Sequence, residues 1–419
     1  MTTETVNRYT QLPLVPDSDM GRRDQAAGPL RVLLVEPEYK LKYPPLGLMK
    51  ISTYHKRRDD EVLFYKGTSP EIRDRGWDII YIATMFTYQW RGVIDTVRFY
   101  QRQKGAARIV VGGILASLLP DELEAETGIR PHVGLWDDVD RLPPDYSLFE
   151  GSDQYGVADA SIAYTTRGCI RRCAFCAVPR LEPGFVPYIP LSPQIESSKK
   201  DLILLDNNVL ASSEFSRIID DIRKAGFERG AKFNGKLRHV DFNQGVDARL
   251  LSEDHMRLLS TIAIHPLRIA FDHIDLKDTY IRKIRLAHKH GIGRLSNYVL
   301  YNFKDTPEGF YKRLRINVEL NEELGLSIFS FPMRYVPLDA KVRGYVDNPH
   351  WTKQQLRGVQ CILHATRGVV GPRRSFFERA FGKDASEFKY IIAQPEEHIF
   401  YRGKMKPYLR RSRPGEEAC

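Results

Sequence analysis

The sequence predicts an α/β chain: a doubly wound parallel sheet, then a partial (β/α)6 barrel, then a small C-terminal extension. Two observations lead to this expectation. Short apolar strands alternate with helical stretches between residues 30 and 120, which is the pattern of a parallel sheet covered by helices. Further along the chain, strand candidates recur about every thirty residues, which is the length of one βα unit.

Composition limits the class of protein. The chain has 419 residues, of which 42% are hydrophobic, enough for two or three domains with buried cores. No apolar run approaches the roughly 20 residues that a membrane span needs, and the polar N-terminus lacks the apolar centre of a signal peptide. Five cysteines are too few for a disulfide-stapled secreted chain of this length. We therefore expect a cytoplasmic protein without a membrane partner.

The first domain is expected at residues 30–120, after a flexible tail at 1–29. Its strands and helices are expected, in order, at 31–35, 48–55, 62–65, 78–84, 91–103 and 109–111. Residues 121–158 contain Pro131, Pro143, Pro144 and a run of acids, so we interpret them as a linker.

The barrel is expected at residues 159–340. Its six strands should start near Ser161, Leu202, Leu237, Leu267, Asn297 and Ser327. Helices fit between them, and the apolar face of residues 215–222 is one example. Ligands of such barrels sit at the carboxyl ends of the strands. The rest, 341–419, is expected to be a helical or irregular extension that ends in a basic tail.

Three of the five cysteines lie within eight residues, directly after the first barrel strand. They are Cys169, Cys173 and Cys176. Iron–sulfur clusters bind through thiolates, so three thiolates on a four-iron cluster leave one iron open to another ligand. A zinc knuckle and chance are the alternatives. Structural zinc prefers four ligands, usually with two-residue gaps within a pair, and no histidine lies between Thr165 and Val178.

The cysteine spacing, with Phe175 just before the third cysteine, resembles the signature of the radical S-adenosylmethionine (SAM) superfamily. The barrel that follows is similar to the core of that family. The resemblance implies a 4Fe–4S cluster that reductively cleaves SAM to a 5′-deoxyadenosyl radical, which abstracts hydrogen from a substrate. It also implies a reducing electron donor of the flavodoxin or ferredoxin type.

The first domain resembles the cobalamin-binding-type domain that precedes many radical SAM cores. The resemblance rests on Pro44-Pro45-Leu46-Gly47 and on Gly112-Gly113-Ile114. Such domains that ligate cobalt carry Asp-x-His-x-x-Gly after the first strand, whereas here the loop 36–47 has no histidine and the first one is His55. We therefore expect a domain that acts as a scaffold and retains little cobalt, and cobalamin binding stays an open alternative.

Polar residues end several barrel strands, and the resemblance assigns some of them to SAM. Asp206 and Asn207 would bind its amino group, although a turn or helix cap explains them equally well. Asn243 and Gln244 would contact its ribose or carboxylate, and Asn302 lies in the segment that passes the adenine. Three further residues have open roles: Arg249 as carboxylate clamp or surface ion pair, His273 as substrate contact or structural group, and Met333 as packing.

Three functions are compared. The leading one is a radical SAM enzyme, the second is a cobalamin-dependent radical methylase, and the third is a non-catalytic iron–sulfur or zinc protein that binds nucleic acid. The net charge of +10 and a basic end suit a nucleic-acid partner, and so does Phe376-Phe377 beside Arg373-Arg374. A solubilising surface and a packed helix face explain the same features, so the substrate stays open among nucleic acid, peptide and metabolite.

Overall fold

The computed structural model describes residues 28–150, 154–157 and 159–403, with the side chains of 401–403 excepted. The chain divides into two compact units. Unit 1 is residues 1–202 with 338–343, and unit 2 is residues 203–337 with 344–419. Most of the expected N-terminal tail lies outside the described residues. So do the side chains of the expected basic tail, which are Arg402, Lys404, Lys406, Arg410, Arg411 and Arg413.

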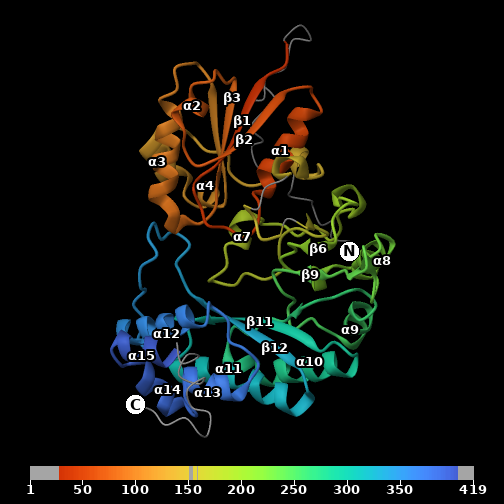
Figure 1. Cartoon of the computed structure of the whole chain (residues 1–419), viewed down its shortest axis with the longest axis vertical. Coiled ribbons are helices and arrows are strands. Elements are labelled where there is room, and N and C mark those ends of the chain that lie inside the picture. Colours follow the sequence, from red (N-terminus) through yellow and green to blue (C-terminus); the bar gives the residue numbers. More distant parts are fainter. Residues whose placement is uncertain (1–27, 151–153, 158, 404–419) are drawn as a thin grey trace, which may run out of the picture. The chain divides into compact units, whose positions relative to one another are not determined.

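Unit 1 begins with a four-stranded parallel sheet in the order β2-β1-β3-β4. Its strands are β1 (Arg31–Glu36), β2 (Glu61–Lys66), β3 (Ile79–Thr84) and β4 (Arg108–Gly113). Helices α1 (Leu46–Lys56) and α3 (Trp90–Gln101) cover opposite faces (Figure 1). Successive side chains of β1 enter the two cores in turn, Leu33 and Val35 on one face and Val32 and Leu34 on the other. The predicted doubly wound domain is confirmed.

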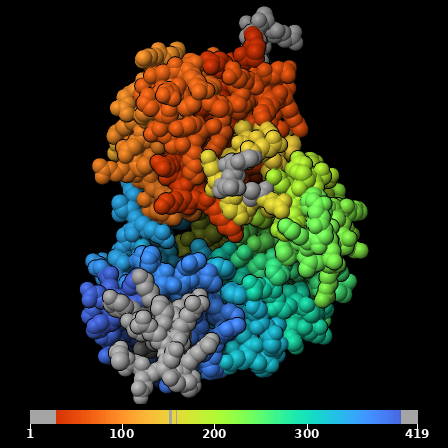
Figure 2. All heavy atoms as spheres, in the orientation of Figure 1, coloured from red at the N-terminus to blue at the C-terminus, as the bar shows by residue number. Residues whose placement is uncertain are grey.

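The described residues 121–150 of the expected linker at 121–158 are a packed part of unit 1, contrary to what their prolines and acids suggest. They carry most of α5 (Pro120–Thr127), and α6 (Asp137–Asp140) and the 3-10 turn η4 (Tyr146–Phe149). The Ser52 hydroxyl of α1 donates to Asp145 at 2.6 Å, and the Thr53 hydroxyl donates to the Pro143 carbonyl at 2.7 Å. In Figure 2 the yellow atoms of this segment lie against the red surface of the first domain. Side chains of α1 therefore hold this segment against the helix by hydrogen bonds.

The six barrel strands occur where the sequence predicts them, with one correction. Unit 1 holds β5 (Ala160–Ala163), β6 (Asp201–Leu204) crosses the division between the units, and unit 2 holds β9 (Val240–Phe242), β10 (Leu267–Arg268), β11 (Arg294–Tyr301) and β12 (Ser327–Arg334). The last three form a parallel sheet in the order β10-β11-β12. The third strand starts at Val240 rather than near Leu237, which belongs to a small antiparallel hairpin of β7 (Lys232–Phe233) and β8 (Lys236–Leu237).

The C-terminal extension packs on the last barrel helix of unit 2, α11 (Pro307–Leu324). The barrel helices before it are α8 (Phe215–Lys224), α9 (Glu253–Leu259) and α10 (Lys277–Lys289). The extension adds α12 (Lys353–Ala365), α13 (Arg374–Phe381), α14 (Ala385–Ile392) and α15 (Glu396–Gly403). The remaining short elements are α2 (Pro70–Arg73), η3 (Thr87–Gln89), α4 (Ile114–Leu118), α7 (Val178–Leu181), η5 (Ser192–Gln194), η6 (Val209–Ala211) and η7 (Ile274–Leu276). No described helix is long and apolar enough to cross a membrane.

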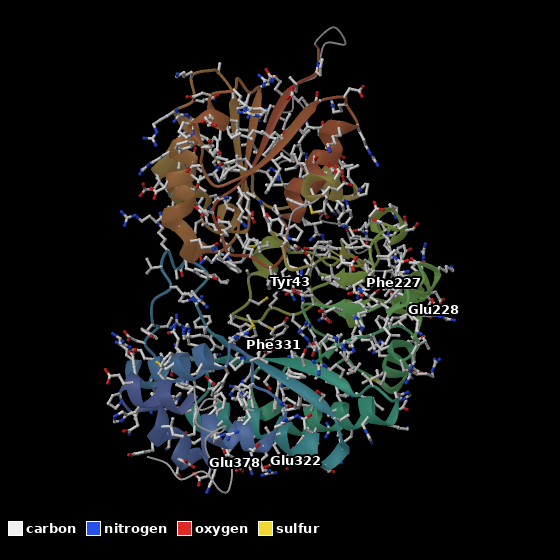
Figure 3. The ribbon with its side chains drawn as sticks, in the orientation of Figure 1. Tyr43, Phe227, Glu228, Glu322, Phe331 and Glu378 are labelled. Carbon is white, nitrogen blue, oxygen red and sulfur yellow. The ribbon has the colours of Figure 1, made fainter. Side chains whose placement is uncertain are left out.

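The Phe376-Phe377 pair is part of this packing. Phe377 is fully buried in a core shared by α11 and the extension. Arg374 is held by Glu322 at 2.5 Å and lies 3.7 Å from Glu378, two acids that Figure 3 labels. The ring of Phe377 is therefore closed to a stacking base, and the neighbouring basic charge is engaged by acids.

Candidate metal centre and barrel strand ends

The three cysteines lie in one loop of unit 1 that follows β5. Each is half-buried, the Arg171 backbone N–H donates to the Cys169 Sγ at 3.3 Å, and the Cys176 N–H donates to the Cys173 carbonyl at 3.0 Å. Among the described residues, no three His, Cys, Asp or Glu side chains come together as a site for a single ion. A four-iron cube takes its thiolates at separate corners, and hydrogen bonds to the sulfurs tune it. The thiols and their donor fit such a cluster.

The two ends of the cysteine loop are pinned together at a narrow neck. Arg167 and Val186 exchange two backbone hydrogen bonds, of 3.1 and 2.9 Å. Gly168 has a φ of +73°, and a Cβ atom there would clash with the carbonyl of Gly184. Its N–H donates to the Glu182 carboxylate at 2.5 Å. Only glycine permits this close approach in that backbone conformation. We call residues 167, 168, 182, 184 and 186 the neck.

The loop is also fixed to the first domain. Ala177 and the α7 residue Leu181 pack against the apolar core of the first sheet. The Arg180 side chain donates to the Leu118 carbonyl at 3.0 Å. Because these contacts follow Cys176 directly, the loop is held on the domain beside it rather than hanging free.

Arg167 joins the neck to that domain through buried charges. Its guanidinium donates to Asp140 of α6 at 3.0 Å and to Glu182 at 3.1 Å, and its Cζ lies 3.5 Å from the Tyr164 ring centre. Lys50 of α1 donates to the Asp140 carbonyl and lies 3.5 Å from its carboxylate. Burial would raise the pKa of Asp140, but the charges of Arg167 and Lys50 outweigh it and lower that pKa. Sequence reasoning missed this cluster, for which Arg-Gly before the first cysteine was the only local signal.

In unit 2 the carboxyl ends of β6 and β9 come together beside the middle of β11. The Asn243 N–H donates to the Leu204 carbonyl at 2.9 Å, and the Tyr298 hydroxyl donates to the Asn243 carbonyl at 2.8 Å. Asp206 and Asn243 are buried, Asn207 is half-buried and Gln244 is exposed. The backbone therefore places Asp206, Asn207, Asn243 and Gln244 at neighbouring strand ends. Their roles toward SAM stay predictions.

Asn302 ends β11 in a strained conformation. It is a buried non-glycine residue with a φ of +61°, and its side-chain amide donates to the Val346 carbonyl at 3.3 Å. Its Oδ1 is buried without a hydrogen-bond partner among the described residues. Such strain and such an unused acceptor are typical of ligand sites. This suits the predicted place beside the adenine amino group, which would be a donor.

Three other strand-end residues have plain surroundings. Arg249 forms an ion pair with Asp247 at 2.7 Å, so it is engaged on the surface. The His273 ring accepts from the Asp275 N–H at 3.4 Å and caps η7. Met333 was expected to pack, but 51% of it is exposed. It lies on the same face of β12 as Phe331, which Figure 3 labels, and that face is only half-buried, whereas Ile328 and Ser330 on the other face are buried.

The carboxyl edge of the first sheet has an apolar surface. Phe86 after β3 and Ile114 after β4 are exposed, and the ring of Phe86 stacks on Tyr88 with centroids 5.0 Å apart. After β1, Glu36 is instead buried, accepting from Tyr155 at 2.6 Å and pairing with Lys66 at 2.9 Å. An apolar edge fits the face of a corrin macrocycle, and the loop 36–47 offers no imidazole to its cobalt.

Comparison with known proteins identifies the class of fold. No protein-family model matches the chain, and no curated protein matches it. Solved structures do match, and they share the α/β fold of this chain.

Two of those structures are of the radical SAM methyltransferase TsrM from Kitasatospora setae. One has cobalamin and a [4Fe-4S] cluster bound; its TM-score is 0.52 at 16% identity, over 74% of this chain and 77% of that one. The other has a tryptophan substrate and the SAM analogue aza-SAM bound; its TM-score is 0.53 at 16% identity, over 74% and 75%. At this identity the likeness concerns the fold.

Proposed function

We propose that this chain is a radical SAM enzyme whose [4Fe–4S] cluster is held by Cys169, Cys173 and Cys176. The observation that carries the proposal is the cysteine loop itself, which places three half-exposed thiols on a pinned neck directly after the first barrel strand. A cluster held by these three thiolates would supply the electron that cleaves the sulfonium of SAM.

The chain's own residues would bind and orient SAM. The Asp206 carboxylate and the Asn207 amide suit its ammonium group, because both present oxygen acceptors. Asn243 and Gln244 lie on the next strand end and suit its ribose or carboxylate. The unused Oδ1 of Asn302 suits the adenine amino group. Phe175, half-buried between Cys173 and Cys176, would lie beside the cluster.

A second candidate is methyl transfer that depends on cobalamin. It is favoured by the apolar carboxyl edge at Phe86 and Ile114 and by a fold shared with a methyltransferase that holds cobalamin. This observation moves the balance away from the pure scaffold that the sequence favours. Since the loop 36–47 has no histidine, cobalamin would bind there without an imidazole from that loop.

One anaerobic experiment tests both candidates. Protein produced with iron and cobalamin supplied is assayed for iron, cobalt and zinc, then reduced with dithionite in the presence of SAM. Close to four irons per chain, with release of 5′-deoxyadenosine, supports radical cleavage. Bound cobalt with transfer of labelled methyl groups supports the second candidate. Stoichiometric zinc without iron contradicts both and leaves the non-catalytic binding protein.

The SAM contacts have their own test. Asp206→Ala and Asn243→Ala should weaken SAM binding, measured by calorimetry, while iron content stays unchanged. Asp254→Ala, at an exposed position on α9, is the control. Equal SAM affinity in all three variants would remove Asp206 and Asn243 from the proposed site.

A further inference from the structure

Four largely buried charged side chains form a network beside the neck of the cysteine loop. Arg167 and Lys50 carry positive charge, and Asp140 and Glu182 carry negative charge. At most 19% of any of these four side chains is exposed. Charges this buried persist only when they are paired. Here two cations meet two anions, so the network is neutral in sum.

The charges act on the backbone that leads into the first cysteine. Glu182 accepts from the Gly168 N–H and pairs with Arg167, so it holds two consecutive residues before Cys169. Arg167 connects these residues to α6 by donating a hydrogen bond to Asp140. Lys50 then ties Asp140 to α1, whose N-terminal end follows the loop of β1. A continuous chain of contacts thus runs from the cysteine loop to the first domain.

We infer that Arg167, together with Asp140 and Glu182, positions the cluster loop on the first domain and sets, by its charge balance, the reduction potential of the bound cluster. The inference rests on the proposed function. The three residues would act as positioning residues, because their hydrogen bonds fix the backbone of the neck that leads into Cys169. Groups around a metal site that orient its ligands typically change its affinity by about 10- to 100-fold when they are removed.

The charge balance gives the inference a signature that a simple folding defect lacks. Arg167→Gln removes a positive charge near the iron–sulfur cluster and leaves the other three charged side chains with a net negative charge. Asp140→Asn and Glu182→Gln each remove a negative charge and leave the other three with a net positive charge. Since net charge near an iron–sulfur cluster tunes its potential, the first variant should lower the potential and the other two should raise it. Disorder of the loop would shift all three in the same direction.

The test uses the full chain with its cluster reconstituted. Iron release to a chelator, the reduction potential and the electron paramagnetic resonance spectrum of the reduced cluster are measured for the three variants. Arg130→Gln is the matched control, because Arg130 of unit 1 also bridges two acids, Asp121 and Glu124, but on the exposed surface. We expect iron release about 10-fold faster than in the wild type. Potentials should shift in opposite directions according to the charge removed, and the control should match the wild type.

Three outcomes overturn the inference. Variants that match Arg130→Gln in iron release and potential show that the contacts have no role toward the cluster. Potentials that all shift the same way show a structural fault only. Arg167→Lys keeps the positive charge. If it restores none of the iron retention lost in Arg167→Gln, the positive charge has no role in holding the iron. If Arg167→Gln does not fold, the nearly isosteric Asp140→Asn and Glu182→Gln decide. A wild-type chain that binds no iron fails the proposed function instead.

Discussion

Two buried arginines, one in each unit, are satisfied in different ways. Arg313 of α11 is fully buried and donates to the carbonyls of Phe271 and Asp272 at 3.0 and 2.7 Å and to the Asp305 carboxylate at 2.6 Å. Arg167 meets two carboxylates and an aromatic ring instead. Arg313 makes most of its hydrogen bonds to backbone carbonyls, including two that follow β10, so it holds the fold. Arg167 uses its donors on side chains around the neck, so it holds the loop.

Substitution of the two arginines should therefore change two different measured quantities. Loss of a backbone-binding arginine removes support from a strand end and from the helix beside it, and should lower the free energy of unfolding. Loss of a side-chain network behind a metal loop should first alter how that loop keeps its metal.

The largest effect should follow removal of a cluster ligand. Cys169→Ala, Cys173→Ala and Cys176→Ala should each lose most of the iron of anaerobically reconstituted protein, because a cluster needs its thiolates. Iron per chain is the measurement. Cys361→Ala is the control, since Cys361 lies in α12 and burial raises the pKa of its thiol, which keeps it protonated. Full iron in the Cys173→Ala protein would contradict the ligand set.

Arg313→Met should be the most destabilising substitution outside the cysteines. It leaves the Asp305 carboxylate buried without its cation, and removing one partner of a buried ion pair costs about 3–5 kcal/mol. Urea denaturation followed by circular dichroism measures the loss. Arg285→Met is the control, because the pair of Arg285 with Glu323 is exposed and such pairs contribute under about 1 kcal/mol. A similar urea midpoint for the two variants would mean that Arg313 does not hold the fold.

Two glycines of unit 1 distinguish the close backbone contact at the neck from the strain of a left-handed backbone conformation alone. Gly168 and Gly128 have φ values of +73° and +72°, but only at Gly168 would a Cβ meet a backbone atom. Gly128→Ala should cost about 1–2 kcal/mol for the left-handed conformation. Gly168→Ala should cost roughly 1–3 kcal/mol more, because the neck must open. Iron retention should fall in Gly168→Ala alone, and equal retention in both would show that the neck is not needed.

The sequence predicted the strands well because each is a short apolar run between helix and turn signals. The third barrel strand was misplaced because Asn234-Gly235 takes positive φ values and turns the chain into a hairpin before Val240. The linker at 121–158 was misread for a related reason. Its prolines and acids are typical of loops, yet here they accept hydrogen bonds from α1.

The site was predictable only where its chemistry is local. Three cysteines in eight residues are a local pattern, and so are polar residues at successive strand ends. The network of Arg167 is not local, because Asp140 and Glu182 lie 27 and 15 residues away along the chain. Asp and Glu are ordinarily exposed, so nothing in their sequence context signalled burial. Pairings of this kind become visible only in three dimensions.

The smallest effect is the pH dependence of stability that Asp140 confers, which tests the charge network of Arg167. Its pKa in the folded chain lies below the ordinary value, because the attraction of Arg167 and Lys50 exceeds the cost of burial. A carboxyl group with a lowered pKa stabilises the fold above its unfolded pKa of about 3.9, and that stabilisation is lost as the pH falls through the lower folded value.

Asp140→Asn should therefore be less stable than wild type at pH 7 by about 1–3 kcal/mol. The gap should begin to shrink as the pH falls below about 4, the unfolded pKa, and should close as the pH passes the lower folded pKa, where the wild-type carboxyl group also becomes neutral. Urea midpoints of the iron-free protein from pH 7 to pH 3 measure this. Gly128→Ala removes no titratable group, so its deficit should keep no such trend. A gap between Asp140→Asn and wild type that widens in acid would show that Asp140 is not held ionised by its two cations.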